Sequence, residues 1–290
     1  MRHWRAEAAL LFNTLIWGVT FVLVKNALTD VSPYLFLALR FSLATLVLLA
    51  YFYLIRPVAP TPFRPAAILP GIFLFAGYAF QTIGLQYTTP SKSAFITGLT
   101  IPLVPFLNSL VYRCKPKFGE LAGVIAATAG IGLLTMPAEH FRIATGDLIT
   151  LGCAFAFAAH ILILGRISGQ VGHDVLSIVQ VAVPALLSGA MLGSVEIPRM
   201  VRSPTVIAAI VICGVLATAL PFTIQAWAQR HTTPTRTALI FACEPLFAWA
   251  TSWLLTGEVL AGRAAAGALL ILAGILLLEL KPFTVQQNQP

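Results

Sequence analysis

The chain has 290 residues, of which 58% are hydrophobic and only 10% are charged. A soluble domain carries roughly 25% charged residues. The shortfall here extends over the whole length, so the composition indicates a polytopic membrane protein. The formal net charge of +8 could suit a nucleic acid, but the cations lie mainly in short hydrophilic gaps and no basic cluster with interleaved aromatic residues is found between the apolar runs. We expect no nucleic-acid partner.

The N-terminus resembles the opening of a signal peptide, because Met1-Arg2-His3-Trp4-Arg5 is followed by an apolar run. Glu7 follows at once, however, and the run continues to about Lys25 without a small-x-small cleavage site. The segment therefore predicts an uncleaved first transmembrane helix.

Ten segments are long and apolar enough to cross a bilayer, which requires roughly 20 residues each. They predict an all-α integral membrane protein with ten transmembrane helices. A polar tail, residues 282–290, follows the last of them. The predicted helices cover about residues 7–27, 33–54, 66–86, 90–112, 118–137, 146–166, 174–195, 204–229, 233–256 and 260–280.

The cations sort unequally between the two sides of this topology. One side carries Arg142, Arg199 and Arg202, and the other carries most of the remaining basic residues, including those at both ends of the chain. Loops rich in Lys and Arg stay in the cytoplasm. We therefore expect a multi-pass protein of the cytoplasmic (inner) cell membrane with both termini cytoplasmic.

An internal repeat divides the chain into two halves of five helices. The matches at an offset of 144 residues are Thr88-Thr89-Pro90 with Thr232-Thr233-Pro234, Gln81 with Gln225, Gly123 with Gly267, and Ala129-Gly130-Ile131 with Ala273-Gly274-Ile275. At an offset of 140, Arg40 matches Gln180. Several matches at one offset argue against chance similarity between apolar helices. Because five is odd, the second half enters the membrane from the opposite side, as in secondary transporters with a substrate site between the halves.

An ordered set of short motifs gives the chain a family resemblance. Trp17-Gly18 lies in the first helix, Arg40-Phe41 in the second, Glu244-Pro245 in the ninth with Gly257-Glu258 after it, and Ala273-Gly274-Ile275 in the tenth. With the two five-helix halves, this set resembles the EamA-type family of the drug/metabolite transporter superfamily. The resemblance implies ten helices, both termini in the cytoplasm, and export of small metabolites, amino acids or drugs.

The resemblance covers residues 1–137 as one repeat and 146–281 as the other. The halves differ at two places: Thr100 stands where the second half has Glu244, and Arg113-Cys114 stands where it has Gly257-Glu258. A proton or an amine handled by Glu244 would therefore involve the second half alone.

Glu244 is the most informative single residue because it lies near the middle of an apolar span. A carboxyl group at this depth faces a cavity or a partner. It could attract a cationic or amine group, or carry a proton. The structural alternative is a carboxyl group that hydrogen-bonds to a neighbouring broken helix.

Arg40 and His160 are also polar residues within spans. Arg40 lies too deep in the second helix for easy snorkelling, so we expect it to point inward, as a carboxylate-binding or a structural group. His160 could take part in proton transfer. On a face shared with Gly152 and Ala156, a hydrogen bond to a neighbouring helix is the alternative role.

Amide and aromatic residues complete the predicted substrate site: Asn13, Trp17, Tyr78, Gln81 and Gln225. Such a lining suits an amphipathic solute such as a hydrophobic amino acid. Hydrogen bonding between helices is the alternative for the two glutamines. Pro102, Pro105 and Pro245 are the hinge candidates, since each removes a backbone hydrogen bond from a repeated helix. Static kinking is equally possible for them. Lys92 and Arg236 are expected to anchor helix starts at the membrane surface.

These observations predict a secondary carrier that moves a small molecule across the lipid bilayer, with possible proton coupling, as a monomer or homodimer. No nucleotide-binding loop, metal-ligand spacing or catalytic triad is found in the sequence, so neither a cofactor nor an enzyme is expected. Two alternatives remain: an intramembrane enzyme acting on lipid, and a structural membrane protein that transports nothing.

Overall fold

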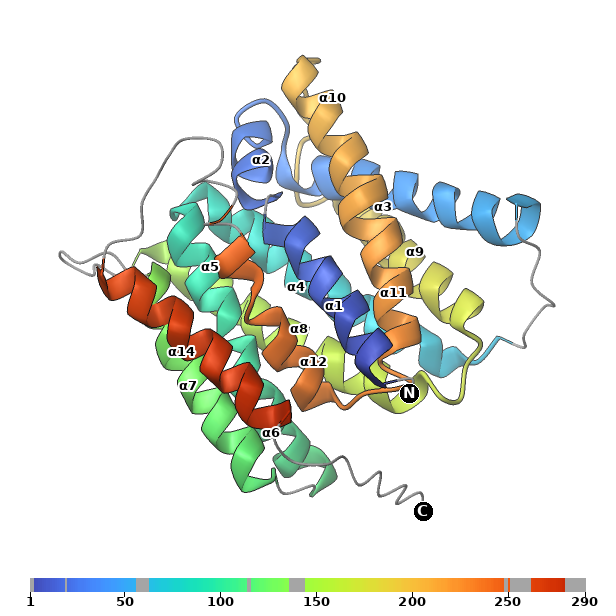
Figure 1. Cartoon of the computed structure of the whole chain (residues 1–290). Coiled ribbons are helices and arrows are strands. Elements are labelled where there is room, and N and C mark those ends of the chain that lie inside the picture. The colour runs from blue at the N-terminus through green and yellow to red at the C-terminus, as the bar shows by residue number, and fades with distance from the viewer. Residues whose placement is uncertain are drawn as a thin grey trace.

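The computed structural model describes residues 3–18, 20–55, 63–113, 116–135, 144–247, 250 and 262–279. Within these ranges the secondary structure is helical and no sheet strand is formed (Figure 1). The predicted polar tail at 282–290 lies outside the described residues, as do Cys114 and the Gly257-Glu258 pair.

The helices follow the predicted order. Their bounds are α1 His3–Gly18, α2 Thr20–Ala27, α3 Pro33–Ala50, α4 Ile68–Gln86, α5 Pro90–Gly98, α6 Thr100–Tyr112, α7 Phe118–Thr135, α8 Thr145–Ile167, α9 His173–Met191, α10 Pro204–Val211, α11 Leu220–Ala228, α12 Pro234–Phe241 and α14 Gly262–Glu279. A π-helical turn, Tyr51–Ile55, extends α3; a 3₁₀ turn, Pro65–Ala67, precedes α4; and a π-helix, Ile212–Ala219, joins α10 to α11.

The helices are those of a multi-pass membrane protein. Seven helical stretches of the described chain are long and apolar enough to cross a membrane, and two more, Phe118–Leu134 and Gly262–Leu277, are apolar but shorter. Two predicted boundaries were wrong. The first helix begins at His3, whose ring hydrogen-bonds to the carbonyl of His231. The seventh ends at Met191, because Gly193 turns the chain with a φ of +78°.

The repeated Thr-Thr-Pro motif is a helix start. Thr89 and Thr233 occupy equivalent N-cap positions, and their hydroxyl groups accept hydrogen bonds from the backbone N–H groups of Lys92 (3.3 Å) and Arg236 (3.2 Å). The proline that follows each threonine takes the first helical position, where its missing N–H costs nothing. The motif therefore fixes the starts of α5 and α12.

Both of these helices break at equivalent places. The α5–α6 helix is interrupted at Leu99, and the helix of α12 is interrupted at 242–243 and resumes at Glu244. At each break the backbone N–H groups bond three residues back, from Leu99 to Ile96 (3.1 Å) and from Cys243 to Ile240 (3.0 Å). Pro102 and Pro245 lie just after the breaks, where they remove the hydrogen bonds that would continue an α-helix.

Glycines allow α7 and α14 to pack backbone against backbone, side by side at one edge of the bundle (Figure 1). A Cβ atom added to Gly123 would lie 2.6 Å from the carbonyl oxygen of Gly274, and one added to Gly130 would lie 2.6 Å from that of Gly267. The reverse contacts, from Gly274 to Gly123 and from Gly267 to Gly130, are equally short at 2.6 Å. The two helices are therefore antiparallel and held by small residues, as is common in membranes.

We expect Gly130→Ala to destabilise the protein by about 1–3 kcal/mol, because the added methyl group meets backbone atoms that cannot move aside. The matched control is Gly189→Ala in α9, where an added Cβ meets nothing within 4 Å. Thermal unfolding of the purified protein in one detergent measures both. Equal melting temperatures for the two variants would contradict this packing.

Candidate functional site

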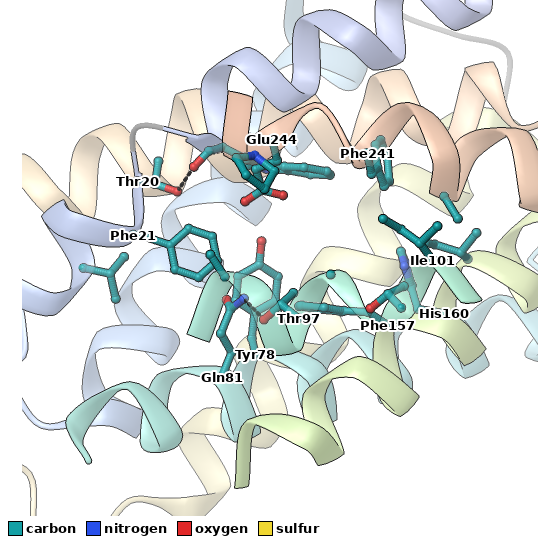
Figure 2. Close-up of a pocket in the computed structure, with 18 of the residues that line it drawn as sticks. Thr20, Phe21, Tyr78, Gln81, Thr97, Ile101, Phe157, His160, Phe241 and Glu244 are labelled. Carbon is teal, nitrogen blue, oxygen red and sulfur yellow. Dashed lines mark hydrogen bonds between the residues drawn. The ribbon is translucent and has the colours of Figure 1, made fainter. Parts of the chain in front are cut away.

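One cavity lies inside the bundle beside both helix breaks. It offers about 120 Å³ to the centres of water-sized molecules, and its walls come from helices of both halves of the chain. Figure 2 shows Glu244 on one side and Tyr78 and Gln81 on the other, with His160 toward one end. Gly98, Thr100 and Pro245 place the two breaks in its wall.

The structure brings most of the predicted site residues together. Those that line the cavity are Trp17, Arg40, Tyr78, Gln81, His160, Gln225, Glu244 and Pro245. Asn13, Pro102 and Pro105 are not among the lining residues. Asn13 lies behind the wall, where its side-chain amide donates to the carbonyl of Pro221 (2.9 Å) and joins α1 to α11.

Arg40 is held by neutral groups. Its side chain is only 3% exposed. Its Nε donates to the hydroxyl of Thr218 (2.7 Å), and its Nη2 donates to the carbonyl of Ala217 (3.1 Å) and the hydroxyl of Tyr78 (3.3 Å). The guanidinium also lies over the Tyr78 ring, 4.5 Å from its centre, an arrangement that stabilises a buried cation. With these donors engaged, Arg40 positions the wall of the cavity.

The carbonyl of Ala217 is available to Arg40 for a local reason. Pro221 lies four residues later and has no N–H to donate to it, and the helix here is a π-helix, a form often found at functional sites. The freed carbonyl accepts from Arg40 and also from the indole N–H of Trp17 (3.0 Å). Trp17 is thereby fixed edge-on against Phe241, with ring centres 5.0 Å apart.

Glu244 differs from Arg40 in having no such set of partners. Its carboxylate makes no hydrogen bond or ion pair with any residue that the structure describes, and it lines the cavity. Tyr78, which accepts a hydrogen bond from Arg40, lines the same cavity. In Figure 2 the Tyr78 hydroxyl points toward the Glu244 side of the cavity. The site therefore presents a carboxylate that is available to a ligand.

His160 forms the hydrogen bond to a neighbouring helix that was one of its two predicted roles. Its Nε2 lies 3.1 Å from the side-chain oxygen of Gln180, and the Gln180 amide donates to the carbonyl of Phe222 (3.0 Å). The His160 ring also packs edge-on against Phe222, at 5.8 Å between ring centres. These contacts position Phe222 in the cavity wall.

The two matching glutamines have different partners. The Gln81 amide donates to Thr97 (3.3 Å), across from α4 to α5. The Gln225 amide donates to Gln229 (3.0 Å), which donates in turn to the carbonyl of Ile161 (2.9 Å). The side-chain oxygen of Gln225 is buried and has no hydrogen-bond partner among the described atoms. This oxygen is therefore an unsatisfied acceptor enclosed in the wall.

Aromatic rings cover much of the remaining wall. Tyr78 makes edge-on contacts with Phe41 (5.2 Å), Phe157 (5.3 Å) and Phe222 (6.1 Å between ring centres). Phe157, Phe222, Phe21 and Phe241 all line the cavity. Flat apolar walls with a few polar groups are typical of small-molecule sites.

Thr218 and Gln180 are the partners that the sequence reasoning missed. Gln180 could have been found, because it matches Arg40 in the repeat and occupies an equivalent place behind the second half's wall. Thr218 carries no signal in the sequence, since a threonine in an apolar helix usually bonds to its own backbone. Among the described residues, no group of three or more His, Cys, Asp or Glu side chains could hold a metal ion.

The sequence model of the EamA-like transporter family matches residues 4–136 and again residues 144–280. The chain belongs to this family. This EamA-family chain is 32% identical to an uncharacterized transporter of Archaeoglobus fulgidus over 95% of its own length and 86% of the relative's. It is 27% identical to a protein of Salmonella typhimurium named a probable amino-acid metabolite efflux pump, over 91% of each chain.

A solved crystal structure has the same fold. It superposes on 95% of the EamA-family chain and 96% of its own with a TM-score of 0.80, at 20% sequence identity. At that identity the likeness supports the fold alone.

We expect Thr218→Val to destabilise the protein by about 1–3 kcal/mol, because the buried Arg40 Nε loses its acceptor. Thr223→Val is the matched control on the same stretch of helix, since the Thr223 hydroxyl donates to the Ala219 carbonyl of its own helix (2.8 Å). Thermal unfolding measures both variants. A loss as large in the control would contradict the role given to Thr218.

Proposed function

We propose that the chain is a secondary active transporter that exports a small metabolite, such as an amino acid or a drug, by alternating access. The observation that carries the proposal is a cavity beside two helix breaks, with a carboxylate available in its wall. Membrane carriers bind their substrates where broken helices meet between two repeats. The family and the name of the Salmonella relative agree with export.

Two inverted repeats of five helices are part of the proposal, with one repeat over residues 1–137 and the other over 146–281. The family model matches each half separately. The glycine contacts between α7 and α14 support a two-fold relation, because exchanging the halves turns the Gly123–Gly274 contact into the Gly267–Gly130 contact. The helix breaks at Leu99 and Cys243 are also equivalent under this exchange.

The proposed topology has ten transmembrane helices with both termini in the cytoplasm. Nine apolar helical stretches are described, and α12 with the residues after its break would begin the remaining one. The excess of Lys and Arg in alternate gaps supports the orientation. Helices of both halves of the chain line the cavity, and we propose transport by a monomer or a homodimer.

The substrate class follows from what the cavity walls offer. Arg40 is engaged with neutral partners, whereas the Glu244 carboxylate is available, so an amine is the charged group that the site suits best. The aromatic walls suit an apolar side chain. We therefore propose an amphipathic amine, with hydrophobic amino acids as the first candidates.

Coupling to protons would use the same carboxylate. Glu244 can hold either a proton or the amine of the substrate, and exchange between the two would link export to proton entry. Pro245 directly follows Glu244 at the break, so movement of this helix would change the surroundings of the carboxylate. Pro102 and Pro105 have the corresponding role in α6, and all three prolines are proposed as hinges.

Glu244→Gln is expected to reduce transport of hydrophobic amino acids in proteoliposomes by roughly 10- to 100-fold, the value of one charge-assisted hydrogen bond. Uptake of radiolabelled leucine, phenylalanine and tryptophan, with and without a proton gradient, measures this. A thermal-shift screen of the same solutes reports binding separately, since a bound ligand raises the melting temperature.

Glu120→Gln is the matched control, because Glu120 caps the start of α7 through the backbone N–H of Lys117 (3.2 Å) and is not a cavity residue. Transport by this variant should equal that of the unchanged protein. Full transport by Glu244→Gln would contradict the site, and the absence of any solute movement under every gradient would contradict the function.

A further inference from the structure

Two ion pairs hold the chain together at positions related by the internal repeat. Arg236 Nη1 lies 2.7 Å from Glu7 Oε1, and Lys92 Nζ lies 3.4 Å from Asp147 Oδ2. Lys92 matches Arg236 at the offset of 144 residues, and Glu7 matches Asp147 at the offset of 140. All four side chains are at most 16% exposed. The two pairs are therefore copies of one arrangement.

The pairs lie at opposite ends of the bundle. The span formed by α1 and α2 runs from one end to the other, with Glu7 near its start and Lys25 near its finish. The Lys25 ammonium donates to the carbonyl of Thr88 (3.1 Å), and the Thr88 hydroxyl donates to Asp147. Asp147 thus lies at the far end of this span from Glu7, and each pair occupies its own end of the molecule.

Each pair also joins the two halves at the edge of the cavity. Glu7 belongs to the first family match and Arg236 to the second, while Lys92 belongs to the first and Asp147 to the second. Ala94 and Ala238, two residues after the cations in α5 and α12, line the cavity. The cations therefore lie just outside the cavity on the same broken helices that form its wall.

Helix stability does not account for these cations. Both occupy the first turn of a helix, three residues after the threonine cap. The helix dipole disfavours positive charge there, and partial burial adds a desolvation cost. A carboxylate from the other half offsets both effects, so the contact between halves is the reason for the charge.

We propose that Glu7–Arg236 and Asp147–Lys92 are the two gates of the transporter, each closing one mouth of the cavity. The inference rests on the proposed function. When the halves rock against each other, one pair separates and its mouth opens while the other pair stays closed. Both pairs are formed in the present conformation.

The gates differ in the hydrogen bonds around them. Asp147 accepts hydrogen bonds from Thr88 and from the backbone N–H of Ala144 (2.8 Å), besides its contact with Lys92. Thr232, the counterpart of Thr88, has a buried hydroxyl without a hydrogen-bond partner in the described part of the chain. The two gates therefore differ at this position, although the ion pair of the Glu7 gate is the shorter one (2.7 Å against 3.4 Å).

Hydrogen–deuterium exchange of the purified full chain in lipid nanodiscs tests the gates. Glu7→Gln should speed exchange roughly threefold or more in residues 3–10 and 232–238, because exchange follows the population of the open state. It should also slow exchange in residues 86–95 and 145–150 at the opposite mouth. Asp147→Asn should give the reverse pattern, and Glu120→Gln should change neither end.

A change confined to the end that carries the substitution would overturn the proposal, because an ion pair that only stabilises the fold has no effect on the far mouth. If Glu7→Gln does not fold, Glu7→Asp takes its place. It keeps the charge but shortens the side chain, and it should give a weaker form of the same two-ended pattern. Two-ended exchange without amino-acid transport would contradict the proposed function and leave the gates standing. Transport with one-ended exchange would contradict the gates alone.

Discussion

Every polar group that this chain carries into the bilayer has to find its partner inside the protein, because hydrocarbon offers none. Pro221 cannot give the Ala217 carbonyl the hydrogen bond of an α-helix, and Arg40 and Trp17 donate to this carbonyl from two other helices. This one carbonyl ties the first, second and eighth spans together around the cavity. The carboxylate of Glu244 lines the cavity without such a partner among the described residues, and the buried side-chain oxygen of Gln225 also lacks one.

The internal repeat of the sequence relates many contacts of the structure, and in the proposed function its departures from symmetry give the two halves different tasks. Helix caps, helix breaks, the glycine contacts and the ion pairs recur at matching positions. The carboxylate does not recur, because Thr100 occupies the place of Glu244 and donates to the carbonyl of Ala154 (3.3 Å). In this account both halves open and close the cavity, while the second half alone handles the charged group of the substrate.

Much of the fold and of the cavity lining could be predicted from the sequence. The length of each apolar run identifies a membrane span, and the cost of burying a polar side chain in the membrane draws attention to the few polar residues within these spans. Glu244 and Gln81 were found in this way, and both line the cavity. Asn13 could not be placed, since spacing on a helix gives a shared face but not which neighbour that face meets. The Glu7–Arg236 contact joins residues 229 positions apart, and only the packed structure shows that these helix starts meet. The expectation that Arg236 anchors at the membrane surface missed this partner.

The most direct test of the account is the reaction of a single cysteine, placed at Gln81, with a membrane-impermeant thiol reagent added to one side of the vesicles or to the other. If one cavity opens alternately, the cysteine reacts from both sides, and leucine or phenylalanine slows both reactions. A cysteine that reacts from one side only, under every gradient and with every solute while transport continues, would contradict alternating access through this cavity.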